Sequence, residues 1–174
     1  MYFGWVYSLL SFQVLHGLQV GPQFSVIRKS LFDNYQLSTG YRNEAADQLA
    51  VLYALSTGTK MGYLNKIHGE YFIHGSNSSA ACQGASLEKQ IAIRKALIRG
   101  YKEYEGFLDL KPFEVKAINK RIANEYFWQL GYNLSLQKGD FAKAYKYFKR
   151  GLSYDPLDLR KWKTFLVNCL RHKL

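Results

Sequence analysis

The sequence has few cysteines, and this excludes several kinds of small protein. Only two of its 174 residues are cysteines, Cys82 and Cys169, and they stand far apart in the chain. His172 lies close after Cys169, but one such pair supplies too few ligands for a structural zinc site. Two cysteines are also too few for a disulfide framework, so a reducing cytoplasm is the expected compartment.

The sequence also lacks an apolar run long enough to cross a membrane. The most apolar segment, residues 5–20, contains Gln13, His16 and Gln19. A spanning helix needs roughly 20 predominantly apolar residues. No basic segment precedes this run and no small-residue cleavage site follows it, so the features of a signal peptide are missing. We therefore predict a buried or interfacial helix that ends at Gly21-Pro22.

Acidic residues are scarce relative to basic ones. Lysine and arginine number 24 against 13 aspartates and glutamates, which leaves a net charge of +11. A field of this sign favours phosphates, nucleic acid or an acidic membrane surface as partners. The alternative is that these residues cover solvated faces of helices. No RNA-binding motif and no DNA-binding helix-turn-helix pattern stands out, so nucleic acid is the least favoured partner.

The hydrophobic content of 48% predicts a folded chain, and its pattern divides the chain into two parts. Residues 1–84 show mixed signals: an apolar stripe predicts a helix over residues 44–55, and a polar loop is expected over residues 75–84. We predict an α+β fold, mainly α, with short strands at residues 24–28, Met61–Leu64 and 70–73.

Residues 85–174 have the apolar period of helices throughout. Ser86 is a suitable N-cap, and Pro112 suits the first position of a second helix that runs to about Gln137. A tight turn at Gly139 precedes a third helix over residues 141–152. Its inward residues are expected to be Ala144, Phe148 and Leu152. A last helix is expected to begin at Asp155-Pro156 and to end near Arg171.

Part of this helical tail, at about residues 122–156, resembles one tetratricopeptide repeat, which is a helix-turn-helix unit. Phe141, Ala144 and Phe148 have the family spacing after Gly139. Leu130-Gly131 departs from it, because it stands eight residues before Gly139 rather than seven. Solenoids need about three repeats, so one unit should dock on its neighbours. A generic helical hairpin is the alternative.

Residues 21–79 carry four short motifs whose order is more specific than any one of them. The first ends in the basic pair Arg28-Lys29, and the second places Asp47 near the start of a helix. The third is the strand expected at Met61–Leu64. The fourth contains His74 and Asn77. Together they resemble the acceptor-side part of a family-2 glycosyltransferase with the glycosyltransferase A fold.

This resemblance implies a function for each motif. Asp47 would be the catalytic base that takes the proton from the acceptor hydroxyl, although Ala46 replaces the first acid of the family's usual pair. Arg28, Lys29, His74 and Asn77 would contact the substrate, and His74 could also meet a divalent metal. The parent enzyme would use Mg²⁺ or Mn²⁺ to transfer a hexose from a nucleotide sugar to a glycan or lipid-linked acceptor, in cell-surface polysaccharide synthesis.

The donor-binding half of such an enzyme has no counterpart in the sequence. The closest approach to its metal-binding Asp-x-Asp motif is Asp155-Pro156-Leu157-Asp158, which is one residue too long. We therefore expect residues 1–84 to be a truncated catalytic domain that is inactive alone, binds no metal alone and is followed by a helical tail. The alternative function is a helical protein-interaction module with a degenerate enzyme remnant. The basic surface favours a cytoplasmic location, with loose attachment to the inner face of an anionic membrane.

Overall fold

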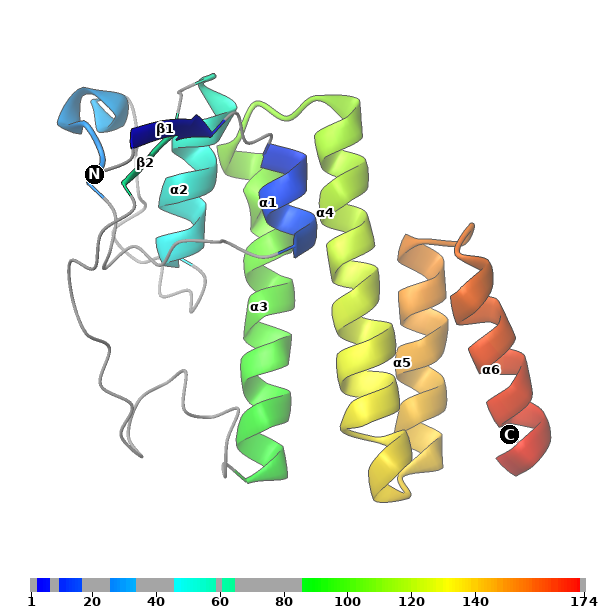
Figure 1. Cartoon of the computed structure of the whole chain (residues 1–174). Helices are drawn as coiled ribbons and strands as arrows, with labels where there is room; N and C mark the ends of the chain where they lie inside the picture. Colours follow the sequence, from blue (N-terminus) through cyan, green and yellow to red (C-terminus); the bar gives the residue numbers. More distant parts are fainter. Residues whose placement is uncertain are drawn as a thin grey trace.

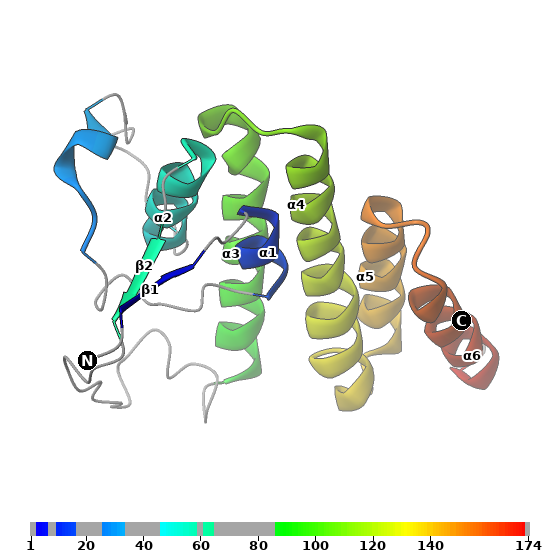
Figure 2. The same ribbon diagram turned by 45° about the horizontal axis from the view of Figure 1, so that its top comes forward.

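A computed structural model describes residues 3–6, 10–16, 26–33, 46–58, 61–64 and 86–172. Helices dominate this part of the chain. Figures 1 and 2 show the four longest arranged side by side in chain order, α3 (Leu87–Phe107), α4 (Pro112–Asn124), α5 (Phe141–Tyr154) and α6 (Leu159–His172).

The first two of these helices begin where the sequence predicts. The Ser86 hydroxyl accepts a hydrogen bond from the backbone N–H of Lys89 at 3.3 Å, which caps α3. Pro112 opens α4, and the carboxylate of Glu114 accepts the backbone N–H of Lys111 at 2.8 Å. Both caps satisfy N–H groups that a helix leaves without partners in its first turn.

Helix α4 continues without a break into a π-helical segment, η4 (Glu125–Asn133). At its end the N–H of Leu134 bonds to the carbonyl of Gln129, five residues back, at 3.0 Å. A short 3₁₀ turn, η5 (Leu136–Lys138), then leads to Gly139, whose φ of +81° suits glycine. The predicted tight turn at Gly139 is confirmed.

The last two helices begin at aspartates. Asp140 caps α5 by accepting the N–H of Lys143 at 3.1 Å. The predicted start of the last helix at Asp155-Pro156 is wrong, because the N–H of Asp155 still bonds to Gly151 and ends α5. Asp158 opens α6 instead, since its carboxylate accepts the N–H of Arg160 at 3.0 Å.

The N-terminal elements are short. Strands β1 (Phe3–Val6) and β2 (Met61–Leu64) form an antiparallel pair in which Phe3 lies opposite Leu64. Between the two strands in the sequence lie helix α1 (Leu10–His16), a 3₁₀ turn, η2 (Lys29–Phe32), and helix α2 (Ala46–Ser56). The helix predicted over residues 5–20 is therefore wrong in its first part, where Trp5 belongs to β1.

The predicted α+β class with a remnant of a glycosyltransferase A sheet is contradicted. The strand expected at residues 24–28 does not form over its described part, where Val26 is fully exposed. Strand β2 pairs only with β1, which is four residues long and whose last two residues belong to the segment predicted as a helix. No mixed sheet is present in the described ranges. Short apolar runs without a clear period do not distinguish strand from helix or loop, which explains the error.

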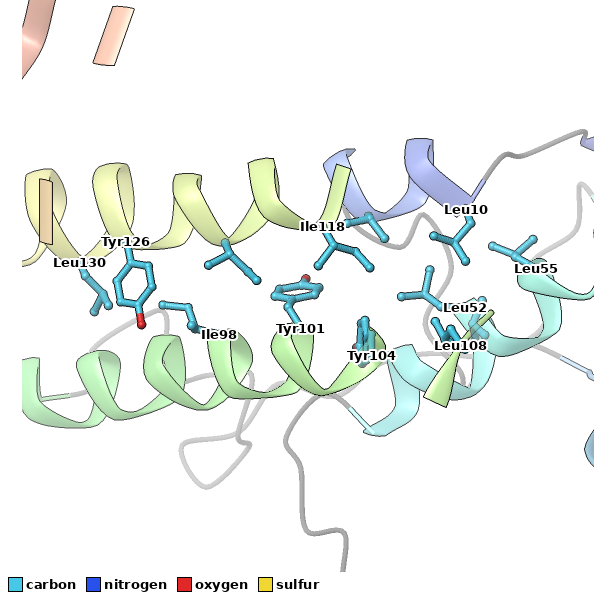
Figure 3. Close-up of a cluster of buried hydrophobic side chains, with 13 residues drawn as sticks. Leu10, Leu52, Leu55, Ile98, Tyr101, Tyr104, Leu108, Ile118, Tyr126 and Leu130 are labelled. Carbon is cyan, nitrogen blue, oxygen red and sulfur yellow. The ribbon is translucent and has the colours of Figure 1, made fainter. Parts of the chain in front are cut away.

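A single hydrophobic cluster connects the two parts of the chain. Figure 3 shows Leu10 from α1 and Leu52 from α2 pointing toward Tyr104 of α3 and Ile118 of α4. All four side chains are at most 2% exposed. The small N-terminal helices are therefore packed on the helical tail through a shared core, as expected for two parts of a chain that no long linker separates. The fold is helical, and a two-stranded ribbon is attached to it.

Candidate interaction surface on α6

The structure describes only some of the residues predicted to form a catalytic site. Arg28 and Lys29 are exposed, at the start of η2. Asp47 is the second residue of α2. His74 and Asn77 lie outside the described residues. Among the residues that the structure describes, no group of three or more His, Cys, Asp or Glu side chains could hold a metal ion.

The tail has a tightly packed helical hairpin in η4 and α5. A Cβ atom added to Gly131 would lie 2.8 Å from the ring of Phe148, and one added to Gly151 would lie 2.7 Å from Cβ of Phe127. Only glycine permits so close an approach between the two helices. The predicted inward residues Ala144, Phe148 and Leu152 are confirmed as buried.

Helix α6 packs on the outer side of this hairpin through aromatic contacts. The ring of Phe165 lies 6.3 Å from that of Phe148 and 5.5 Å from that of Tyr145. Near the end of the helix, His172 stacks on Phe141 with 4.1 Å between the ring centroids. These contacts determine which face of α6 is turned inward.

A buried lysine fixes the beginning of α6. Lys161 is 0% exposed, and its ammonium donates to the carboxylate of Asp155 at 2.7 Å and to that of Asp158 at 3.1 Å. Burial alone would raise the pKa of Asp158, but hydrogen bonds from Lys161 and Arg160 lower it to about 2. The indole N–H of Trp162 also donates to the carbonyl of Pro156 at 2.7 Å. The turn before α6 is therefore held by charge and by hydrogen bonds.

The opposite face of α6 is apolar and exposed. Leu159, Leu166 and Leu170 are 79%, 54% and 83% exposed, and Trp162 is partly exposed between them. Their spacing of three or four residues places them in one row along the helix. We call these four residues the α6 stripe. A monomeric protein rarely exposes so continuous a row of large apolar side chains unless it meets a partner there.

Cations adjoin this stripe. Lys163 is exposed on α6 next to Trp162 in the sequence, and no carboxylate of the described residues is ion-paired with it. Arg171 is exposed farther round the helix, and Arg160 pairs with Asp158 at 3.4 Å. The surface therefore combines an apolar centre with a positive margin.

The sequence analysis predicted the bounds of the last helix but did not assign its inward and outward faces, so it did not find this surface. In the structure Lys161 is buried and the α6 stripe is exposed. A signal was present: Asp155 and Asp158 precede Lys161 at distances that allow one lysine to meet both acids. The apolar row at 159, 162, 166 and 170 was also readable, although the side of the helix that it occupies was not.

Comparison with protein-family models, with curated proteins and with solved structures found no match to this chain. The glycosyltransferase resemblance therefore has no support from these comparisons, and the fold contradicts it. Within the described residues, no helix has both the length and the apolar character that a bilayer-spanning segment requires.

Proposed function

We propose that this chain is a helical protein-interaction module, and that the α6 stripe binds an amphipathic helix of another protein. The observation that carries this proposal is the exposure of Leu159, Leu166 and Leu170 in a row on a helix whose other face is already packed. An amphipathic helix can pack on such a row through apolar side chains of its own that are spaced three and four residues apart.

The margin of the stripe indicates the charge of the partner. Lys163 would face an acidic side chain at the edge of a bound helix, and such complementarity favours encounter and fixes orientation. A second copy of this chain would present the same cations, so two α6 stripes would meet with like charges opposed. We therefore expect a different protein that supplies a helix with leucines on one face and glutamates beside them.

Two synthetic peptides test this proposal. Both are helices of about 20 residues with the same leucine row, one flanked by glutamates and the other by lysines. We expect the full chain to bind the glutamate-flanked peptide at least about tenfold more tightly than the lysine-flanked one, by fluorescence anisotropy of labelled peptide. Leu166→Ser with Leu170→Ser should abolish binding, since it removes two anchors of the stripe.

The matched control replaces exposed apolar residues elsewhere, Leu87→Ser with Phe113→Ser, and should bind like the unmodified chain. Equal binding of both peptides, or binding that survives the stripe substitutions, would overturn the proposal. So would a stable dimer in analytical ultracentrifugation that the stripe substitutions dissociate, because the occupant would then be a second copy. Tighter binding to phosphatidylserine vesicles than to the acidic peptide would assign the surface to a membrane instead.

The other functional expectations remain predictions. Glycosyl transfer with Asp47 as base requires a fold that the described residues do not show. The vesicle measurement tests the predicted location at a membrane surface.

A further inference from the structure

A different surface, polar and positively charged, lies on the other side of the hairpin. There a cluster of tyrosines separates α3 from α5. Tyr126 of η4 points toward α3 and is only 6% exposed (Figure 3). Its ring lies nearly parallel to those of Tyr147 and Tyr154 of α5, at centroid distances of 6.4 Å and 5.9 Å. Three aromatic rings from two elements thus form one surface between the helices.

Cations from both helices rest on this surface. The ammonium of Lys102, from α3, lies 5.7 Å from the ring centroid of Tyr126 and 5.3 Å from that of Tyr154. The guanidinium of Arg150, from α5, lies 5.7 Å from the Tyr126 centroid. A hydrogen bond to the Tyr154 hydroxyl raises the pKa of Lys102, so its charge persists. The ring faces attract both cations and offset part of their mutual repulsion.

A cavity of about 480 Å³ adjoins the tyrosines, and it shares Tyr147 and Arg150 with them. It is an open hollow, and all of its basic lining residues are exposed to solvent. Five of its six lining residues are basic, and they come from two helices. The lining consists of Lys95 from α3 with Lys143, Lys146, Tyr147, Lys149 and Arg150 from α5.

Most of these cations are not neutralised. Lys143 pairs with Asp140 at 2.7 Å, but no carboxylate in the described ranges is ion-paired with Lys95, Lys146, Lys149 or Arg150. Four like charges around one hollow repel one another, and a bound anion would relieve that repulsion. An ordinary solvated face would spread its cations or alternate them with acids.

The two walls are held in place by a separate ion network. Glu125 of η4 is 2% exposed, and its carboxylate receives Arg94 of α3 at 3.2 Å and Arg121 of α4 at 3.0 Å. The guanidinium of Arg121 also lies 5.7 Å from the ring of Tyr101. This network joins α3 to η4 next to Tyr126, and η4 packs closely on α5, so the spacing of the two walls is set before any ligand arrives.

We propose that this cavity binds a compact polyanion with two or more linked phosphate groups. The walls place positive charge on opposite sides, so the ligand must present negative oxygens in several directions within one small group. A phosphate chain does this, whereas a single carboxylate presents its oxygens in one plane. Lysine ammoniums bind phosphate as point charges, and the Tyr147 hydroxyl can donate to a phosphate oxygen. This site is distinct from the α6 stripe and does not depend on the function proposed for it.

The experiment measures binding of inorganic tripolyphosphate to the full chain by isothermal titration calorimetry at constant ionic strength. We expect saturable binding near one ligand per chain, accompanied by a higher melting temperature. Lys95→Glu with Lys146→Glu changes one residue in each wall and should weaken binding at least about tenfold. Lys116→Glu with Lys120→Glu makes the same change in net charge on α4, outside the cavity, and should alter affinity less than about twofold.

Three outcomes would overturn the proposal. Equal loss of binding in both double variants would show that net charge, and not the cavity, holds the ligand. Citrate binding as tightly as tripolyphosphate would show that the site does not select phosphate. A single-stranded RNA of about 12 nucleotides that binds more tightly than tripolyphosphate, with the same loss in both variants, would point to a diffuse nucleic-acid surface instead. Circular dichroism verifies that both variants keep their helices.

Discussion

Among single residues, Lys161 has the most unusual environment, a fully buried ammonium between Asp155 and Asp158. Lys161→Ala would leave two partly buried carboxylates without their cation. Breaking a buried pair costs about 3–5 kcal/mol, and because water still reaches both acids we expect about 2–3 kcal/mol here. Urea unfolding should show this loss, whereas Lys163→Ala, on the exposed side of α6, should stay within about 0.5 kcal/mol of the unmodified chain. Similar values for the two variants would show that the pair contributes little.

The same ion pair makes the free energy of unfolding depend on pH in the acidic range. The pKa of Asp158 is lowered from 3.8 to about 2 in the folded chain. The stabilisation is therefore complete above pH about 4 and is lost as the pH falls through about 2, because the unfolded chain takes up the proton first. Asp158→Asn keeps an oxygen that can cap α6. It should destabilise the chain by on the order of 2 kcal/mol at pH 7 and by much less at pH 2, in urea titrations at both values. A difference that stays constant across this range would exclude titration of Asp158 as its cause.

At the scale of elements, the contact between η4 and α5 depends on glycine. Gly151→Ala would bring Cβ within 2.7 Å of Phe127 and 3.0 Å of the carbonyl oxygen of Ala123, which cannot move aside freely. We expect a loss of about 1–3 kcal/mol from overpacking, despite the better helix propensity of alanine. Gly106→Ala in α3 meets no atom within 4 Å and should stabilise by about 0.5–1 kcal/mol. Thermal unfolding of the two variants should therefore shift in opposite directions, and shifts of the same sign would contradict this account.

The helices of the tail could be predicted because their signals are local. Ser86, Pro112 and Gly139 act within one turn of the chain, through a cap, a fixed φ and a positive φ, so no tertiary contact is needed to interpret them. The N-terminal part differs. Strand β1 exists only through its pairing with β2, almost sixty residues away, and residues 24–28 had apolar side chains but no partner strand among the described residues. Pairing between distant segments is not encoded in short apolar runs.

The candidate surfaces were predictable only in part. The positive charge of the tail was evident from composition, but composition could not show that Lys95 and Lys146 line one cavity from two helices. That arrangement depends on the packing of α3 and α5 around η4. The glycosyltransferase motifs show the opposite error, since Asp47 and Arg28 have suitable chemistry in the sequence but no mixed sheet to position them in the part of the chain that the structure describes.

At the scale of the whole molecule, the shared core predicts cooperative unfolding. Leu52 of α2 is 1% exposed and belongs to the same cluster as Ile118 and Ile122 of α4. Leu52→Ala should cost about 2–5 kcal/mol, and because the core is continuous the loss should extend to α4. Hydrogen exchange at the amides of Ile118 and Ile122 should accelerate by a factor that matches the global loss in urea unfolding. Exchange in α4 that remains unchanged would show that the tail unfolds independently of α2.

The π-helical segment η4 has a consequence for how the chain tolerates changes in length. Its wide turns, nine residues in all, occupy the region in which the spacing of Leu130-Gly131 to Gly139 exceeds the repeat pattern by one residue. In a regular α-helix one additional residue rotates all later side chains by about 100° relative to the earlier ones, so residues before and after it would not keep the same face toward α5. A π-helical turn holds more residues than an α-helical turn, so it accommodates the additional residue locally and leaves the rest of the helix in register. The hairpin thereby keeps its close glycine contacts on one side and its tyrosine surface on the other.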